Sequence, residues 1–201
     1  MRQLSKPWSV WREAATTWPR SRPSPAVLAQ IAAALNLKAQ QITAAQLLDN
    51  GPVWLGLLLV GADTVLQIAP DHAALKHIGI KVGVVGAYPA APAPLLIARG
   101  NREARAFGSA TPAVGAGPEI ADFEVRAFAA PLGINEDPVT GSLNASLAQW
   151  LIAEGHAPER YLATQGACLG RSGQVHITRD AAGQVWVGGE SVTCVEGSVT
   201  L

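Results

Sequence analysis

The segment GINEDPVTGSLNASLAQ, residues 133–149, combines residue types that can bind and act on a small acid. Asp137 precedes a proline, and proline favours the first position of a helix or the turn before it. The backbone N–H groups of Thr140, Gly141 and Ser142 would then lie where a helix begins. Unpaired donors and the helix dipole at such a position favour a carboxylate or a phosphate. Gly141 would let this anion approach the backbone closely, and the two hydroxyl groups could add hydrogen bonds.

Two adjacent carboxylates, Glu136 and Asp137, lie beside this positive helix end in the sequence. Either carboxylate could transfer a proton or bind a substrate amine. The same pattern also fits a plain helix cap, in which the aspartate stabilises the helix by about 0.5–2 kcal/mol. The residue types alone leave both interpretations open.

The helix that would present this segment is predicted over Gly141–Glu154. Its apolar side chains recur at helical spacing, and alanines keep its other sides small. A helix with this composition suits burial inside a sheet. The apolar positions are Leu143, Leu147, Trp150 and Leu151, and the small ones are Ala145 and Ala148.

The rest of the chain reads as short helices followed by many strands. Helices are predicted at Ala26–Leu37, Ala44–Leu48 and Asp71–His77. Strands are predicted at Val53–Val60, Thr64–Ile68, Ile80–Val85, Leu95–Arg99, Phe123–Phe128, Gln174–Arg179, Gln184–Gly188 and Ser191–Val195. Strands and helices do not alternate regularly, so we expect an α+β fold with a curved, mostly antiparallel sheet rather than a doubly wound parallel one.

Composition narrows the class of protein. The 201 residues carry 15 basic and 15 acidic side chains, so no net field attracts nucleic acid or a membrane surface. The two cysteines, Cys168 and Cys194, do not make a disulfide framework, which favours structural thiols and a cytoplasmic location. The four histidines lack ligand spacing, so no metal site is expected. The start of the chain is basic and poor in acids, as transit peptides are, although a poorly packed beginning is the simpler interpretation.

Several motifs resemble those of the PhzF-like isomerase family. EDPVTGS (136–142) is similar to the family signature E-D-P-x-T-G-S-A, and QGACLGRSGQVHI (165–177) resembles its Q-G-x-x-x-G-R-x-G hairpin. VWVGGESVTCVEGSVTL (185–201) matches the closing pattern of the family. Together with similar strings after residue 50, these matches cover most of residues 50–201 in the family's order.

The resemblance implies a diaminopimelate-epimerase-like fold. Family members consist of two similar domains, each a barrel-like sheet wrapped around a central helix, with the active site in the cleft between them. Residues 23–192 would form the second of these domains, and the first would be largely absent. Residues 1–22 would be a poorly matched remnant or a crossing segment, and residues 193–201 a closing strand that packs on the missing domain.

The resemblance also implies a function. Family members are isomerases or epimerases that transfer a proton at carbon without a metal or an organic cofactor, and the best-known member acts in phenazine biosynthesis. Asp137 would be the catalytic aspartate that holds and positions a small carboxylate-bearing metabolite. The start of the helix, at Gly141 and Ser142, would bind the carboxylate of that metabolite, with Thr140 beside them.

The sequence departs from the family pattern in ways that keep a second interpretation open. In the family, the first domain supplies a general acid/base glutamate in a Ser-Glu-Thr-like motif and a Gly-His-Pro motif opposite it. This sequence contains no Gly-His-Pro and no glutamate in such a context. Leu143-Asn144-Ala145 replaces a string that is often Ala-His-Cys, so the specificity would differ. The chain could therefore be a catalytically inactive fragment that binds small acids or self-associates. Loss of a domain would leave an apolar patch, which favours a homodimer.

Overall fold

The computed structural model describes residues 9–12, 21–89, 120–190, 194–195 and 197–198. The predicted strand Leu95–Arg99 lies outside these residues, and so does most of the predicted closing segment 193–201. In the described part of that segment, Cys194 and Val195 belong to no strand, so the predicted strand Ser191–Val195 receives no support there. The division of the chain at residues 22 and 192 stays a prediction.

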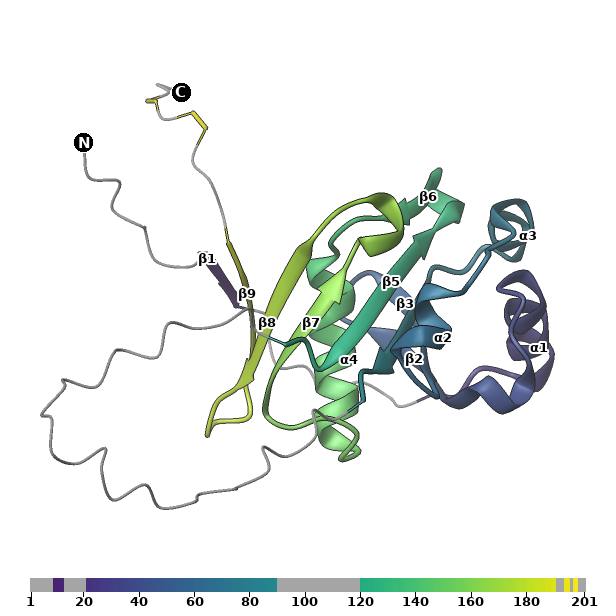
Figure 1. The fold of residues 1–201 in the computed structure, drawn as a ribbon, viewed down its shortest axis with the longest axis horizontal. Coiled ribbons are helices and arrows are strands. Elements are labelled where there is room, and N and C mark those ends of the chain that lie inside the picture. The colour runs from purple at the N-terminus through teal and green to yellow at the C-terminus, as the bar shows by residue number, and fades with distance from the viewer. Residues whose placement is uncertain (1–8, 13–20, 90–119, 191–193, 196, 199–201) are drawn as a thin grey trace, which may run out of the picture.

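Within the described residues, nine strands form one sheet in the order β1-β9-β8-β7-β5-β4-β3-β2, and β6 pairs with part of β5 (Figure 1). The pairs β3/β4 and β5/β7 are parallel, and the remaining pairs are antiparallel. The strands are β1 (Ser9–Arg12), β2 (Ile42–Asp49), β3 (Val53–Leu59), β4 (Val82–Ala87), β5 (Phe123–Ala129), β6 (Ile134–Asp137), β7 (Arg160–Gln165), β8 (Gly173–Arg179) and β9 (Val185–Gly189). The helices are α1 (Pro25–Ala34), α2 (Ala62–Leu66), α3 (His72–Ile78) and α4 (Gly141–Ala153), with 3₁₀ turns at Ala39–Gln41, Ala130–Leu132 and Ala167–Leu169.

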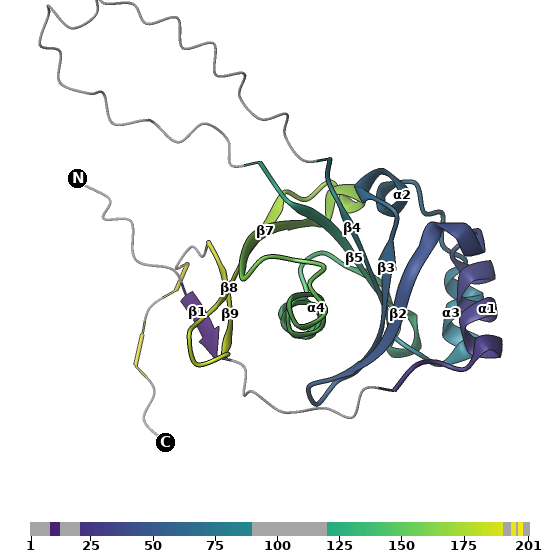
Figure 2. The same cartoon turned by 90° about the horizontal axis from the view of Figure 1, so that it is seen from below.

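The sheet curves around α4, which Figure 2 shows end-on in the middle of the curve. The predicted apolar positions of this helix are all buried, and its two small residues, Ala145 and Ala148, are fully enclosed. Gly83 on β4 lets the sheet approach closely, since a Cβ atom there would overlap the Leu143 side chain. The predicted α+β fold, a mostly antiparallel curved sheet around a central helix, is confirmed.

A second hydrophobic core lies on the outer face of the sheet. Helices α1, α2 and α3 cover β3, β4 and β5 there, and Figure 2 shows α1 and α3 outside the curve. Because β3 packs on α4 through one face and on these helices through the other, six of its seven residues are buried. A strand buried on both faces reads as a continuous apolar run, as VWLGLLL does.

Two predicted elements were assigned to the wrong type. Ala44–Leu48 is part of strand β2, because the turn at Asp49 pairs it antiparallel with β3, and this tertiary pairing overrides the helix propensity of its alanines. Thr64–Ile68 was predicted as a strand, but its first residues belong to helix α2, which packs on β4 and β5. The short strands β6 and β7 were not predicted, since both are polar at several positions.

Candidate functional site

The predicted site lies where two strands end beside β5. Strand β7 runs parallel to the first half of β5, and β6 runs antiparallel to its second half. The carboxyl ends of both strands, Gln165 and Asp137, therefore approach each other next to Val125–Ala127. Helix α4 begins four residues after Asp137, so its N–H groups lie at this junction.

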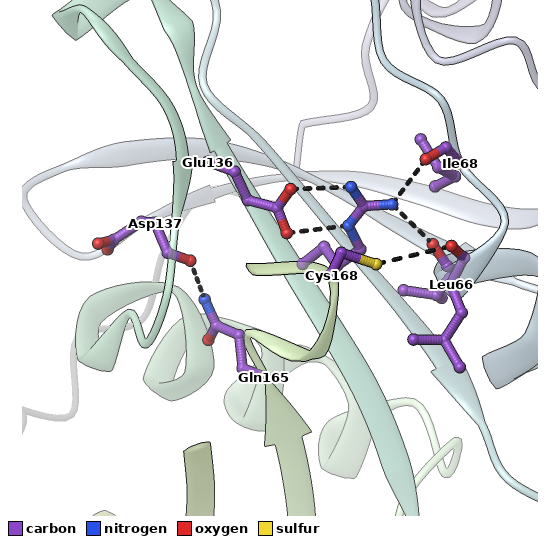
Figure 3. Close-up of polar contacts among 8 residues, drawn as sticks. Leu66, Ile68, Glu136, Asp137, Gln165 and Cys168 are labelled. Carbon is purple, nitrogen blue, oxygen red and sulfur yellow. Dashed lines mark hydrogen bonds and ion pairs between the residues drawn. The ribbon is translucent and has the colours of Figure 1, made fainter. Parts of the chain in front are cut away.

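A buried glutamine, Gln165, joins the two strand ends to the helix. Its side chain is 1% exposed, and its Nε2 group donates to the Asp137 carbonyl at 2.9 Å and to Thr140 Oγ1 at 3.1 Å. Its Oε1 atom accepts from Thr140 N at 3.1 Å and from Asn144 Nδ2 at 2.8 Å. All the side-chain polar groups of Gln165 thus have partners within the protein. Figure 3 shows the contact with Asp137.

The carboxylate of Asp137 is half-buried and is held by one neighbour. Thr140 Oγ1 donates to Asp137 Oδ2 at 2.6 Å. In the part of the chain that the structure describes, Oδ1 of Asp137 accepts no hydrogen bond from the protein. The carboxylate is therefore oriented at one oxygen, and the other oxygen can accept from a ligand.

The neighbouring carboxylate of Glu136 points the opposite way, as Figure 3 shows. It accepts two hydrogen bonds from the Arg126 guanidinium, at 2.9 and 2.8 Å, and the two side chains are 6% and 4% exposed. Arg126 also donates to the carbonyls of Val65 and Ile68 near the end of α2. Burial by itself would lower the pKa of Arg126, but the contact with Glu136 raises it overall. Of the two carboxylates, Asp137 is the one that faces the helix start.

The helix start is open at Gly141 and Ser142. Gly141 is exposed, and a Cβ atom added there would meet nothing within 4 Å. Among the described residues, no group accepts a hydrogen bond from the N–H of Gly141 or Ser142. Thr140 differs, since Gln165 and Asp137 already bind its N–H and its hydroxyl. The structure thus gathers all four predicted site residues, with Thr140 inside the network and the two following amides without an acceptor among the described residues.

Residues that the sequence did not identify complete this site. Asn144, 2% exposed, donates to Gln165 Oε1 and to the Thr140 carbonyl. Asn50, in the turn between β2 and β3, donates to the carbonyl of Ser142 at 2.9 Å. The spacing within the segment 136–142 does not reveal these partners, because they come from segments far apart in the chain. For Gln165, the sequence offers one indication, because Gln165-Gly166 begins the motif at residues 165–177.

A second polar cluster lies on the outer face of the same strands. Glu124 is fully buried, and its Oε2 atom accepts from Tyr88 at 2.8 Å and from Thr164 at 2.5 Å. Its Oε1 atom is buried without a hydrogen-bond partner. Burial raises the pKa of Glu124, and the two hydroxyl contacts offset this increase in part.

Other sequence expectations concern metals, thiols and membranes. The described residues include no group of three side chains that could hold a metal ion. Cys168 is exposed in the 3₁₀ turn Ala167–Leu169, with its Sγ atom 3.6 Å from the Leu66 carbonyl, and Cys194 is also exposed. Of the helices in the described ranges, none has the length and apolar character that a membrane crossing requires.

The sequence matches one protein family model and is similar to several known proteins. The family model for phenazine biosynthesis-like proteins matches residues 12–197. An uncharacterized isomerase of Deinococcus radiodurans is 30% identical over 150 residues, which are 70% of this chain and 41% of that protein. Antisense-enhancing sequence 1 of Schizosaccharomyces pombe is 25% identical over 165 residues, 79% of this chain and 47% of that protein.

Solved structures show the same fold. A PhzF-family phenazine biosynthesis protein of Enterococcus faecalis superposes with a TM-score of 0.59 at 24% identity, covering 96% of this chain and 57% of that one. A predicted epimerase of Pseudomonas aeruginosa gives a TM-score of 0.55 at 21% identity, covering 85% of this chain and 51% of that one. The described fold is therefore diaminopimelate-epimerase-like. The chain spans about half the length of the curated relatives it matches.

Proposed function

Because the chain belongs to the family of phenazine biosynthesis-like, or PhzF-like, proteins, we propose that it is a cofactor-independent isomerase or epimerase. Its substrate is a small carboxylate-bearing metabolite, and the reaction transfers a proton at carbon. Relatives that are named as uncharacterized isomerases support this reaction class. The family description also favours phenazine-like or other secondary metabolism as the source of the substrate.

One observation carries the proposal: the amides of Gly141 and Ser142, which have no acceptor among the described residues, begin a buried helix directly beside the carboxylate of Asp137. Backbone donors at a helix start favour a bound carboxylate, and the helix dipole adds to this preference. When a proton leaves a carbon conjugated with that carboxylate, negative charge spreads onto the carboxylate oxygens. Fixed donors near these oxygens stabilise the charge as it develops.

Asp137 supplies the second contact of the proposed site. Its Oδ2 atom is bound to Thr140, so Oδ1 can accept a hydrogen bond from an amine or a hydroxyl group next to the substrate carboxylate. Such a contact would fix the rotation of the substrate about the bound carboxylate. We assign binding, positioning and charge stabilisation to these residues, and we assign proton removal to none of the described ones.

The reaction class is tested by deuterium exchange. The full chain is incubated in D₂O with a dihydro-hydroxyanthranilate, and the mass of the recovered acid is measured over time. A proton transfer at carbon predicts an increase of one mass unit that depends on the protein and is lost in Asp137→Asn. Binding of the acid without any exchange would contradict the isomerase proposal and favour the alternative, a small-acid-binding protein without turnover.

The proposal extends to assembly and location. We propose that the protein is a cytoplasmic homodimer. Its small-molecule partner is the carboxylate-bearing substrate. Four large apolar side chains near the site are more than 40% exposed, and such surfaces favour association; they are Leu132, Ile134, Val139 and Leu169. Sedimentation of the full chain should give twice the monomer mass of 20.9 kDa at micromolar concentration, and a monomer at every concentration would contradict the dimer.

A further inference from the structure

We propose that Gln165 is the positioning residue of this site: it aims the Asp137 carboxylate through Thr140 and keeps the amides of Gly141 and Ser142 available for the acid. The inference rests on the proposed function, because it explains how the proposed acid-binding groups are held. Gln165 would not touch the substrate. It is 1% exposed, and its side chain makes four hydrogen bonds, all to the protein.

The orientation of the Gln165 amide follows from its neighbours. Oε1 faces Thr140 N and Asn144 Nδ2, which are both donors. Nε2 faces the Asp137 carbonyl, which can only accept. A flipped amide would place NH₂ against two donors and oxygen against a carbonyl oxygen, and each of these contacts is unfavourable. The amide nitrogen therefore faces Thr140 Oγ1.

This orientation fixes the direction of the next hydrogen bond. A threonine hydroxyl has one proton to donate and two lone pairs. Because Gln165 Nε2 donates to Thr140 Oγ1, and the Asp137 carboxylate can only accept, the hydroxyl proton points at Asp137 Oδ2, 2.6 Å away. Gln165 also binds the Asp137 carbonyl, so both the backbone and the side chain of Asp137 depend on the same glutamine.

The same side chain divides the helix start into an occupied and an open part. Oε1 of Gln165 accepts from Thr140 N, the N–H just before the first residue of α4. The next two N–H groups, of Gly141 and Ser142, have no acceptor among the described residues. An incoming carboxylate thus meets two adjacent donors whose position is fixed by a buried neighbour, which is the preorganised arrangement that charge stabilisation requires.

The first experiment needs no ligand. Three-bond NMR couplings report the χ1 rotamers of Asp137 and Thr140 in the full chain. We expect a single rotamer at both residues in the wild type and averaged rotamers in Gln165→Met. Gln184→Met is the matched control, because Gln184 is also buried, at 7% exposure, but binds the Val185 carbonyl away from the site, and it should keep the single rotamers. Unchanged couplings in folded Gln165→Met would overturn the inference.

A second pair of variants applies if Gln165→Met does not fold. Thr140→Val removes the hydroxyl between Gln165 and Asp137 but keeps the shape of the side chain. It should average the Asp137 rotamers, and Thr140→Ser, which keeps the hydroxyl, should restore a single one. Equal couplings in Thr140→Val and the wild type would likewise overturn the inference.

Binding of two probe acids links this geometry to function. Benzoate offers a carboxylate, and 2-aminobenzoate adds a donor that Asp137 can bind. Loss of one oriented hydrogen bond predicts that Gln165→Met weakens 2-aminobenzoate binding by roughly fivefold to tenfold relative to benzoate. The double variant with Thr140→Val should lose less than the sum of the two single losses, because Gln165 orients the Asp137 carboxylate through Thr140. Additive losses would contradict this order.

The two claims fail in different ways. If the wild type binds neither acid, the proposed function is wrong, and the couplings alone decide whether Gln165 positions Asp137. If the wild type binds 2-aminobenzoate more tightly than benzoate and Gln165→Met keeps the full difference, the proposed function stands and the role of Gln165 is wrong.

Discussion

Gly141 has no side chain at the point where the proposed site opens to solvent, and this makes it the most informative single position. Its φ is not among the positive values of the described glycines, so alanine fits its backbone conformation. The absence of side-chain contacts for an added Cβ means that the fold does not require glycine here. In the proposed site, the approaching acid needs the space that a side chain at position 141 would occupy.

We therefore expect Gly141→Ala to separate stability from binding. The free energy of unfolding should stay equal or rise by up to about 1 kcal/mol, since alanine favours a helix over glycine. The affinity for 2-aminobenzoate should fall by at least roughly tenfold, because the new methyl group occupies the approach to the amides. Urea denaturation and calorimetric titration measure the two effects. Unchanged affinity in a stable variant would place the acid elsewhere.

The buried carboxyl group of Glu124 makes the stability of the fold depend on pH. Burial raises its pKa above the usual 4.5, so the folded protein binds its proton more tightly than the unfolded chain does. The stability from this proton is fully present below about pH 4.5 and is lost as the pH rises through the pKa of the folded state.

Glu124→Gln should remove this loss, because glutamine keeps an acceptor for Tyr88 and Thr164 without a titrating group. The free energy of unfolding of the variant relative to the wild type should therefore increase between pH 4.5 and pH 8. Denaturant melts at a series of pH values measure this difference. A constant difference across the series would show that Glu124 does not titrate with a raised pKa.

At the scale of elements, the ion pair between Arg126 and Glu136 connects β5 and β6 with the end of α2. It is almost fully buried, and Arg126 binds two α2-side carbonyls in addition. Removing one partner of a buried pair leaves an uncompensated charge, which is more costly than removing both. The pair also holds the strand from which Asp137 projects.

We expect Glu136→Gln to lower the free energy of unfolding by about 3 kcal/mol. Glu159→Gln, an exposed change of the same chemistry, should alter it by less than about 0.5 kcal/mol. Replacing both Arg126 and Glu136 by methionine should cost less than the single change. If the single change is as mild as the exposed control, the ion pair is not a major contribution to stability.

The sequence predicted the central helix, the strand at Val53–Val60 and the turn that begins the site, because each depends on local periodicity or on residues close together in the chain. It misassigned Ala44–Leu48 and Thr64–Ile68, whose type depends on pairing and packing with distant segments. It also missed Gln165 and Asn50. Their side chains reach the helix start only because β7 and the turn between β2 and β3 are brought beside it.

In the whole molecule, the two faces of the curved sheet pack against different helices. Its inner face buries α4 in one hydrophobic core, and its outer face holds three helices on a second core. Two neighbouring polar side chains of β7 point to opposite faces: Gln165 faces inward at the end of the strand, and Thr164 beside it faces the Glu124 cluster. The sheet thus fixes the start of α4 from one side while the outer layer supports the strands from the other.

The most direct test of this account is a crystal structure of the full chain soaked with 2-aminobenzoate. We predict carboxylate oxygens about 2.7–3.2 Å from the backbone nitrogens of Gly141 and Ser142, with the amino group at Asp137. Water at both nitrogens under a saturating concentration of the acid, or the acid ordered only at another surface, would contradict the central claim.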